Sequence, residues 1–311
     1  MTARHVVFGT GPLGRATAQA LIRRGQAVAL ASRGGSMPEP PDGAQVIAAD
    51  LNDPSAARGA CEGAAAVYLC AQPPYHQWPG LFPALQAAAI EAAASVGARL
   101  VVGENLYGYG PVKQVMTEDL SLVPNTRKGR VRADMHRDLM AAHDAGRVAV
   151  AVARGSDFFG PWVAGSAVGE RAFRAVVQGR PAEVYGDSDA PHSYTFVEDF
   201  GTALAILGTD DRGAGQVWHV PNAPAVSTRR FLELAFRLAE QPSRLKRFTR
   251  LELGLIGLFV PPVRESIEML YEFEQPFVVD HSKFIRTFGD ISTPLEAALA
   301  RTIDWTRGHL G

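Results

Sequence analysis

A glycine-rich turn near the start of the chain constrains the possible folds more than any other feature. The apolar run at residues 4–8 leads directly into Gly9-Thr10-Gly11-Pro12-Leu13-Gly14, which has the spacing G-x-G-x-x-G. After a strand, glycines at this spacing make a tight turn, let the backbone approach a pyrophosphate, and let a helix pack against the strand. Pro12 suits an early helical position that needs no N–H donor, and the helix N-terminus attracts an anion. The pattern predicts a dinucleotide site at these six residues; the alternative is a loop that binds nothing.

The end of the second expected strand, at residues 27–31, indicates which dinucleotide is bound. Sites that prefer NAD usually carry Asp or Glu there to bind the ribose 2′-hydroxyl, whereas this chain has Ser32-Arg33. An arginine suits a 2′-phosphate because it forms charge-assisted hydrogen bonds. The sequence therefore favours NADP(H). The alternative is that Arg33 is a solvated side chain in a loop with Gly34 and Gly35.

Further apolar runs alternate with helical segments along the first half of the chain. Strands are expected there at residues 45–49, 65–71, 99–102 and 148–152, with helices at 15–24, 54–61, 81–96 and 128–145; further along the chain, a helix is expected at 163–179 and a strand at 216–220. This alternation predicts an α/β fold with a doubly wound parallel sheet, in which ligands bind at the carboxyl ends of the strands. Asp50, Leu51, Ala71 and Gln72 follow such ends and are expected to contact the cofactor.

The alternation weakens after about residue 160. We therefore expect residues 1–160 to form mainly the dinucleotide-binding domain. Residues 161–311 would form mainly a small substrate-binding region, interleaved with the last strands of the sheet.

A proline-rich and aromatic segment, residues 72–80, follows the fourth expected strand, where substrate should lie. It contains Tyr75, His76 and Trp78, and further aromatic residues follow the sixth strand at Phe158 and Phe159. His76 could be a general acid or an ordinary surface histidine. Aromatic walls favour an apolar or aromatic small molecule, although aromatic residues also commonly form the core. The full aromatic set near the expected cleft is Tyr75, Trp78, Tyr107, Tyr109, Phe158, Phe159, Trp162 and Tyr194.

Composition narrows the class of partner. The chain has 311 residues, a formal net charge of -1 and 47% hydrophobic residues, so no basic excess points to nucleic acid. The longest apolar run, residues 253–262, is too short to span a bilayer, and the first strand leaves no room for a signal peptide. Two cysteines make no disulfide framework. We expect a cytoplasmic protein that binds a small molecule, without a metal site and without a nucleic-acid or membrane partner.

Motifs along nearly the whole chain resemble the extended short-chain dehydrogenase/reductase superfamily, in its NAD-dependent epimerase/dehydratase group. They are the glycine turn, Asp50-Leu51, Leu106-Tyr107-Gly108, residues 154–161, Val197-Glu198-Asp199, Asp280-His281-Ser282-Lys283 and Pro294-Leu295-Glu296. The resemblance implies a Rossmann fold with the nicotinamide near Asn105, Tyr107 and Lys128. It also implies a homodimer formed through the helices at 81–96 and 128–145.

The catalytic positions depart from this family. The family carries Ser or Thr four residues before its Tyr and a Y-x-x-x-K about twenty-one residues after it, which here fall on Gly103, Lys128 and Arg132. The usual Tyr donates a proton as hydride arrives. Lys128 could replace it as an acid or electrostatic stabiliser if burial or Arg132 made its ammonium more acidic, or it could be a solvated lysine at a helix start. Tyr107 is the competing proton donor.

The expected substrate also differs from the family pattern. Nucleotide-sugar enzymes of the group usually place an Arg seven residues before the Asp of their V-x-D motif, and here that residue is His192. A nucleotide sugar is therefore not expected, and His192 becomes a candidate substrate contact.

These features predict an NADP(H)-dependent oxidoreductase that transfers hydride to or from a C=O, C=N or C=C bond of a small organic substrate. One alternative is a redox-neutral epimerase, dehydratase or cyclase that retains its nucleotide. Another is a non-catalytic NADP-binding regulator. A closed, aromatic-lined cavity beside the nicotinamide position would favour an enzyme.

Overall fold

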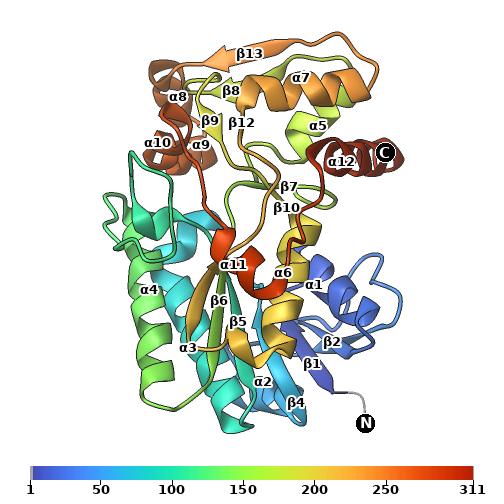
Figure 1. Ribbon diagram of the computed structural model, residues 1–311, viewed down its shortest axis with the longest axis vertical. Coiled ribbons are helices and arrows are strands. Elements are labelled where there is room, and N and C mark those ends of the chain that lie inside the picture. Colours follow the sequence, from blue (N-terminus) through green and yellow to red (C-terminus); the bar gives the residue numbers. More distant parts are fainter. Residues whose placement is uncertain (1–2, 311) are drawn as a thin grey trace.

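A seven-stranded parallel sheet forms the centre of the computed structural model, which describes residues 3–310 (Figure 1). The strands lie in the order β11-β6-β5-β4-β1-β2-β3. Their bounds are β1 Arg4–Phe8, β2 Ala27–Ser32, β3 Ala44–Ala48, β4 Ala64–Leu69, β5 Arg99–Glu104, β6 Val150–Arg154 and β11 Gln216–His219. The predicted doubly wound parallel sheet is confirmed.

The sheet is covered by helices on both faces, which explains why its inner strands are mostly apolar and buried on both sides, whereas the edge strands β3 and β11 are less so. One core lies against α2 (Pro54–Cys61), α3 (Trp78–Ser95) and α4 (Arg127–Asp144). The other lies against α1 (Pro12–Arg23), α6 (Val197–Thr209) and α11 (Ser282–Phe288). Within β1, Val6 faces the first core and Val7 the second, as the two-residue period of a strand requires.

Helices α1 and α6 pack very closely, and this contact holds the glycine turn in place. A Cβ added to Gly201 of α6 would lie 2.3 Å from the backbone carbon of Ala16 in α1. A side chain at residue 201 would therefore push α1 away from α6 and shift the N-terminus of α1.

The second half of the chain forms a smaller layer above the carboxyl ends of the strands (Figure 1). Helices α5 (Glu170–Val177), α7 (Thr228–Leu238) and α12 (Leu295–Gly308) pack on the strand pair β8 (Ala182–Tyr185) and β13 (Leu245–Phe248). Strand β11 also comes from this half, yet it pairs with β6 in the central sheet.

Short elements connect the two layers. They are η1 Tyr75–Gln77, η2 Tyr107–Tyr109, β7 Phe158–Phe159, β9 Pro191–His192, β10 Thr195–Phe196, η3 Asp211–Gly213, β12 Val226–Ser227, α8 Arg250–Gly257, α9 Pro261–Ser266, η4 Ile267–Met269 and α10 Tyr271–Glu274. No helix within residues 3–310 combines the length and apolar character needed to cross a membrane.

Two segments differ from the sequence-based expectation. The aromatic segment 72–80 is partly helical, because η1 covers residues 75–77 and α3 already begins at Trp78, with Pro79 in its first turn. The helix expected at residues 163–179 is limited to Glu170–Val177, since the preceding residues form turns. The first difference matters for the site, because it makes the wall near the substrate position an ordered helix start.

Candidate functional site

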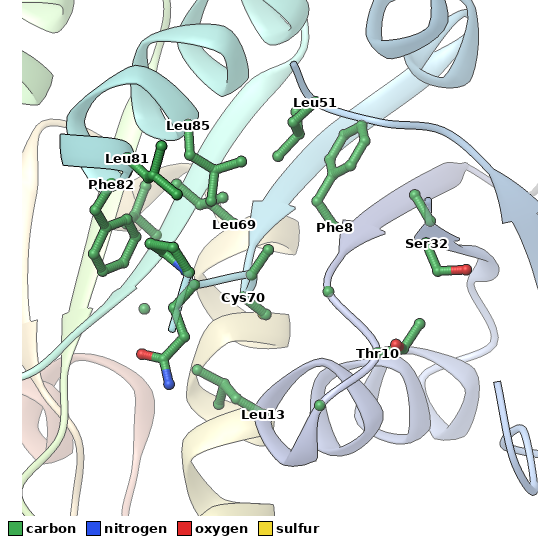
Figure 2. A pocket seen from close by; sticks show the side chains of 18 of the residues that line it. Phe8, Thr10, Leu13, Ser32, Leu51, Leu69, Cys70, Leu81, Phe82 and Leu85 are labelled. Atoms are coloured by element: carbon green, nitrogen blue, oxygen red, sulfur yellow. The ribbon is translucent and has the colours of Figure 1, made fainter. Parts of the chain in front are cut away.

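A large cavity of about 1090 Å³ runs along the carboxyl ends of the central strands, and we call it the outer cavity. Figure 2 shows Leu81, Phe82 and Leu85 of α3 on one side of it and Thr10 and Ser32 on the opposite side. The predicted cofactor residues that line it are Gly9, Thr10, Gly11, Pro12, Leu13, Ser32, Arg33, Asp50, Leu51, Ala71, Gln72 and Asn105. Gly14 and Lys128 do not line it. The fold therefore gathers twelve of the fourteen predicted cofactor residues around one space.

The three glycines of the turn have different steric reasons for lacking a side chain. Gly9 has φ of +112°, and a Cβ there would lie 2.6 Å from the backbone nitrogen of Ala71. A Cβ on Gly14 would overlap the carbonyl oxygen of Gly9 at 1.8 Å, which shows how tightly α1 packs on the turn. A Cβ on Gly11 would meet no protein atom within 4 Å. Gly9 and Gly14 are thus required by the protein itself, whereas Gly11 keeps the backbone open toward the cavity.

The start of α1 is suited to an anion. Its N-cap is Gly11, and no side chain caps the helix. The first N–H groups of a helix have no partner within the helix, and the helix dipole adds partial positive charge there. A pyrophosphate fits this end of the outer cavity because it would supply the missing acceptors.

Arg33 is exposed and lines the outer cavity just beyond β2. Among the described residues, nothing forms an ion pair or hydrogen bond with its guanidinium. The charge of Arg33 is therefore available to a ligand.

A buried charged cluster closes the other end of the outer cavity. Glu104 Oε2 accepts a hydrogen bond from Arg154 Nε at 3.0 Å and lies 3.5 Å from His136 Nδ1. Arg132, which also lines the cavity, donates to the carbonyl oxygen of Gly103. Burial alone would raise the pKa of Glu104, but the charge of Arg154, with His136 and Arg132, outweighs it and lowers the pKa to about 2.

Three polar atoms of this cluster have no hydrogen-bond partner among the described residues. Glu104 Oε1, Arg132 Nε and His136 Nδ1 are buried and make no hydrogen bond with any residue from 3 to 310, and the first two belong to residues that line the outer cavity. Buried polar groups normally find partners, so a ligand with both a donor and an acceptor fits this end of the cavity. The carboxamide of a nicotinamide has both groups.

A second, smaller cavity of about 230 Å³ adjoins the first, and we call it the inner cavity. Both cavities share the wall residues Pro12, Gln72, Trp78, Asn105, Gly155 and Phe158. The inner cavity is further lined by Tyr75, Leu106, Tyr107, Ser156, Asp157, Trp162, Val163, Ala164, Gly165, Ser166, Glu272 and Phe277. A ligand that fills the outer cavity would therefore reach the mouth of a small aromatic pocket.

The inner cavity also holds polar groups. Asp157 Oδ2 lies 3.0 Å from Nε2 of His192, whose ring stacks on Phe273 at a centroid distance of 4.9 Å. The hydroxyl oxygen of Ser156 and Oε1 of Glu272 are buried without a hydrogen-bond partner among the described residues. Such unpaired groups indicate that a polar part of a ligand belongs in this space.

The predicted substrate residues separate into two groups. Tyr75, Trp78 and Phe158 line the inner cavity. His192 contacts Asp157 but does not itself line the outer or the inner cavity. His76 is exposed and also lines neither cavity. Phe159 is 1% exposed and packs in the core against Phe173, Phe196 and Phe231, away from both cavities.

The two candidate catalytic residues are also separated. Tyr107 lines the inner cavity. Lys128 is fully buried, but its Nζ donates to Glu265 Oε2 at 2.7 Å and to Glu268 Oε1 at 3.0 Å, and it lines neither cavity. Its ammonium lies 4.4 Å from the ring centre of Tyr75. Lys128 therefore holds the segment containing α9 and η4 against the wall of the inner cavity, and it is not solvated.

Sequence reasoning missed Glu104, Ser156, Asp157 and Glu272. The first three follow or end strands, so their position at the carboxyl edge of the sheet was a usable signal. Glu272 gave no such signal, because it stands in Tyr271-Glu272-Phe273-Glu274, about 170 residues after β5 and outside any strand. Only the tertiary structure brings it to the site.

The solved structures that share this architecture include epimerases. A UDP-glucuronic acid 4-epimerase from Bacillus cereus in complex with NAD is 14% identical, with a TM-score of 0.80 over 99% of this chain and 100% of that one. An epimerase from Methanothermobacter thermautotrophicus is 17% identical, with a TM-score of 0.82 over 99% and 93%. The Thermus thermophilus UDP-glucose 4-epimerase complex with NAD is 18% identical, with a TM-score of 0.78 over 98% and 99%. These similarities establish the fold.

Sequence comparison gives the family. Among curated proteins, no sequence matches this chain. The model of the NAD dependent epimerase/dehydratase family matches residues 6–220, which include the glycine turn, part of β1, the other six strands of the central sheet and the three catalytic positions of the family. The chain therefore belongs to the NAD dependent epimerase/dehydratase family.

Proposed function

We propose that this protein is an NADP(H)-dependent enzyme that exchanges hydride with a small organic substrate. The observation that carries the proposal is the shared wall of the two cavities. The outer cavity extends from Arg33 to Asn105, and Asn105 and Trp78 also line the inner cavity. A dinucleotide and a substrate bound in the two spaces would meet at this wall.

The chain's own residues fit each part of the dinucleotide. The uncapped N-terminus of α1 and the open backbone at Gly11 suit the pyrophosphate. Arg33 suits a 2′-phosphate, and the unpaired atoms of Glu104 and Arg132 suit the nicotinamide end. When bound, the cofactor would supply or accept the hydride. Structural relatives crystallised with NAD support a nicotinamide dinucleotide, and Arg33 is our reason for proposing its phosphorylated form.

The inner cavity favours a small substrate. Its 230 Å³ lies below the range of about 300–1,000 Å³ that is typical of pockets for drug-sized ligands. Its walls combine aromatic rings with buried, unpaired oxygens of Ser156 and Glu272. This combination supports a compact molecule with an apolar body and one polar group, rather than a nucleotide sugar. A cavity of this kind also favours an enzyme over a regulator that only binds its nucleotide.

The cofactor is tested by Arg33→Ala. Loss of a charge-assisted contact should weaken NADPH binding by about 1.5–3 kcal/mol and leave NADH binding nearly unchanged. Calorimetric titration of both nucleotides measures this difference. Arg58→Ala, which removes an exposed arginine of α2 outside both cavities, is the control for net charge. Equal losses for NADPH and NADH would refute the assignment of Arg33.

The reaction is tested with a panel of small ketones, imines and enones, by following NADPH oxidation in absorbance. Consumption of NADPH in proportion to product supports hydride exchange. Family membership favours one second candidate, a redox-neutral epimerase or dehydratase that retains its nucleotide. Turnover of a substrate while the bound nucleotide stays unconsumed would establish that candidate instead.

A further inference from the structure

We propose that Glu272 is a catalytic residue that donates a proton to the substrate in the inner cavity. This inference rests on the proposed function. It names the residue that would protonate the substrate when hydride is transferred. The family's usual Tyr and Ser or Thr are replaced here by Lys128 and Gly103, so another acid must do this work if the reaction requires one.

Glu272 is buried at the wall of the inner cavity. It lies in the short helix α10, its residue is 2% exposed, and it lines the inner cavity. Its Oε1 has no hydrogen-bond partner within residues 3–310. A buried carboxyl group that faces a cavity without a protein partner is placed to bond a ligand instead.

The described charged and titratable groups around Glu272 include no cation. The charge of Asp157 acts on Glu272, and the hydroxyls of Tyr75, Tyr107 and Tyr271 lie near enough to be influenced by the charge of Glu272. None of these four is a cation. Burial, and then the charge of Asp157, raise the pKa of Glu272 well above its ordinary value, so both favour the protonated carboxyl group.

Tyr107 and Lys128, the other candidate proton donors in this region, are less suited to protonate the substrate. Burial raises the pKa of the Tyr107 phenol well above its ordinary value, which makes it a weaker acid than a free tyrosine. Lys128 is bound to Glu265 and Glu268 outside both cavities. A raised carboxyl pKa instead moves an acid toward neutral pH, where general acids act most effectively.

Asp157 has a different part in this arrangement. Its Oδ2 is held by His192 Nε2 at 3.0 Å, and the His192 ring is stacked between aromatic side chains that include Phe273 and Phe277. Asp157 therefore stays fixed beside Glu272 and disfavours its ionised form. We regard Asp157 and His192 as positioning residues that keep the proton on Glu272.

In the direction of reduction, the substrate gains a hydride and the proton of Glu272. The hydride brings two electrons to the carbon of a C=O or C=N bond, and the π electron pair moves to the heteroatom. The O–H bond of Glu272 breaks, its electron pair stays on the carboxylate, and the proton forms the new O–H or N–H bond. The substrate is reduced by two electrons and the dinucleotide is oxidised by two. Water returns a proton to Glu272 after the product leaves.

The protonation state can be measured without cofactor or substrate. Infrared difference spectra of wild type against Glu272→Gln at pH 7 should show the C=O stretch of a neutral carboxylic acid, shifted in D₂O, in the wild type alone. Glu274→Gln is the matched control, because Glu274 lies on the same helix and is paired with Arg250 outside both cavities. This variant should retain the band. Absence of the band from wild type at pH 7 would overturn the inference.

The catalytic role needs turnover data on the same variants. Glu272→Gln should lower kcat by about 10²-fold or more while NADPH affinity changes only a few-fold. Wild-type kcat should be highest at low pH and fall as Glu272 ionises, and the residual activity of the variant should lack this pH dependence. Normal turnover in Glu272→Gln, or a loss confined to Tyr107→Phe, would overturn the inference.

Failure of the inference is distinct from failure of the proposed function. If wild type oxidises NADPH with a substrate and Glu272→Gln does so equally well, Glu272 is not the donor. If wild type binds no nucleotide, or never consumes it with any substrate, the proposed function itself is wrong and the donor role falls with it.

Discussion

Glu104 and Glu272 are two buried glutamates whose pKa values shift in opposite directions, one in the charged cluster of the outer cavity and the other in the inner cavity. Their exposed fractions are similar, at 4% and 2%. Glu104 is paired with Arg154 and has a pKa lowered to about 2, whereas Glu272 has no cationic partner among residues 3–310 and a pKa raised well above its usual value. Similar burial therefore gives opposite pKa shifts.

The comparison shows that the neighbouring element decides the charge. Strands β5 and β6 are adjacent, and their register places Glu104 directly opposite Arg154. A buried carboxylate is costly unless a cation or hydrogen-bond donors compensate it, because removing an ion from water costs several kcal/mol. Glu272 reaches the site on α10, where burial and the charge of Asp157 disfavour its ionised form. The first arrangement favours the anion, and the second favours the protonated acid that we propose as the donor.

The largest expected effect comes from breaking the Glu104 pair. Glu104→Gln leaves the Arg154 guanidinium buried without its counter-charge, so the free energy of unfolding should fall by about 3–5 kcal/mol. Urea denaturation at pH 7 measures it. The control is Glu91→Gln at the exposed pair with Arg147, where about 1 kcal/mol or less is expected. Equal effects of the two variants would show that the buried pair contributes no more than a surface one.

The pH dependence of the Glu104 variant has a definite sign. Because its folded pKa lies near 2, below the unfolded value near 4.5, the stabilising contribution of Glu104 is present above about pH 4.5. It is lost as the pH falls toward 2. The difference between wild type and Glu104→Gln should therefore shrink in acid.

Glu272→Gln should change the free energy of unfolding by less than Glu104→Gln does, and in the opposite direction. The folded protein retains the Glu272 proton while the unfolded chain releases it above about pH 4.5, so this group makes wild type less stable as the pH rises. The variant lacks that penalty and should gain free energy of unfolding relative to wild type between pH 5 and pH 8. Urea denaturation at both pH values measures the gain. Glu274→Gln should show no comparable gain, and a flat difference for Glu272→Gln would mean that Glu272 is ionised in the folded protein.

The smallest expected change in the free energy of unfolding concerns Asp199, a third buried carboxylate. It accepts hydrogen bonds from Thr293 and forms no ion pair with any residue from 3 to 310. Burial raises its pKa to about 6, although the backbone N–H and hydroxyl of Thr293, both at 2.7 Å, act to lower it. Thr293→Val removes one donor, so the pKa should rise further and the free energy of unfolding at pH 8 should fall by about 1 kcal/mol. Titration followed by NMR of labelled Asp measures the pKa. Thr287→Val, whose hydroxyl bonds a carbonyl of α11, should leave Asp199 unchanged.

The nucleotide side of the site was largely predictable because it depends on local sequence. The spacing of Gly9, Gly11 and Gly14 specifies a turn in which Gly14 packs on Gly9, and only the contact of Gly9 with Ala71, after the end of β4, comes from a distant segment. Runs of apolar residues predict buried parallel strands, and the residue after each strand must lie at the same edge of the sheet. Ser32, Asp50 and Gln72 could therefore be placed on the outer cavity from sequence alone.

The substrate side was decided by the tertiary structure. Phe158 and Phe159 are adjacent and chemically identical, yet one lines the inner cavity and the other is in the core, because neighbouring residues of β7 point in opposite directions. Lys128 occupies the family's Tyr position in sequence, but α9 and η4 bring Glu265 and Glu268 against it. Glu272 reaches the inner cavity from a segment that no local pattern connects to the sheet. Local sequence determines which chemical group a residue carries and which secondary structure it forms. Its burial and its charged neighbours come from distant segments of the chain. Those distant segments decide whether a carboxyl group or an ammonium is paired, buried or available to a ligand.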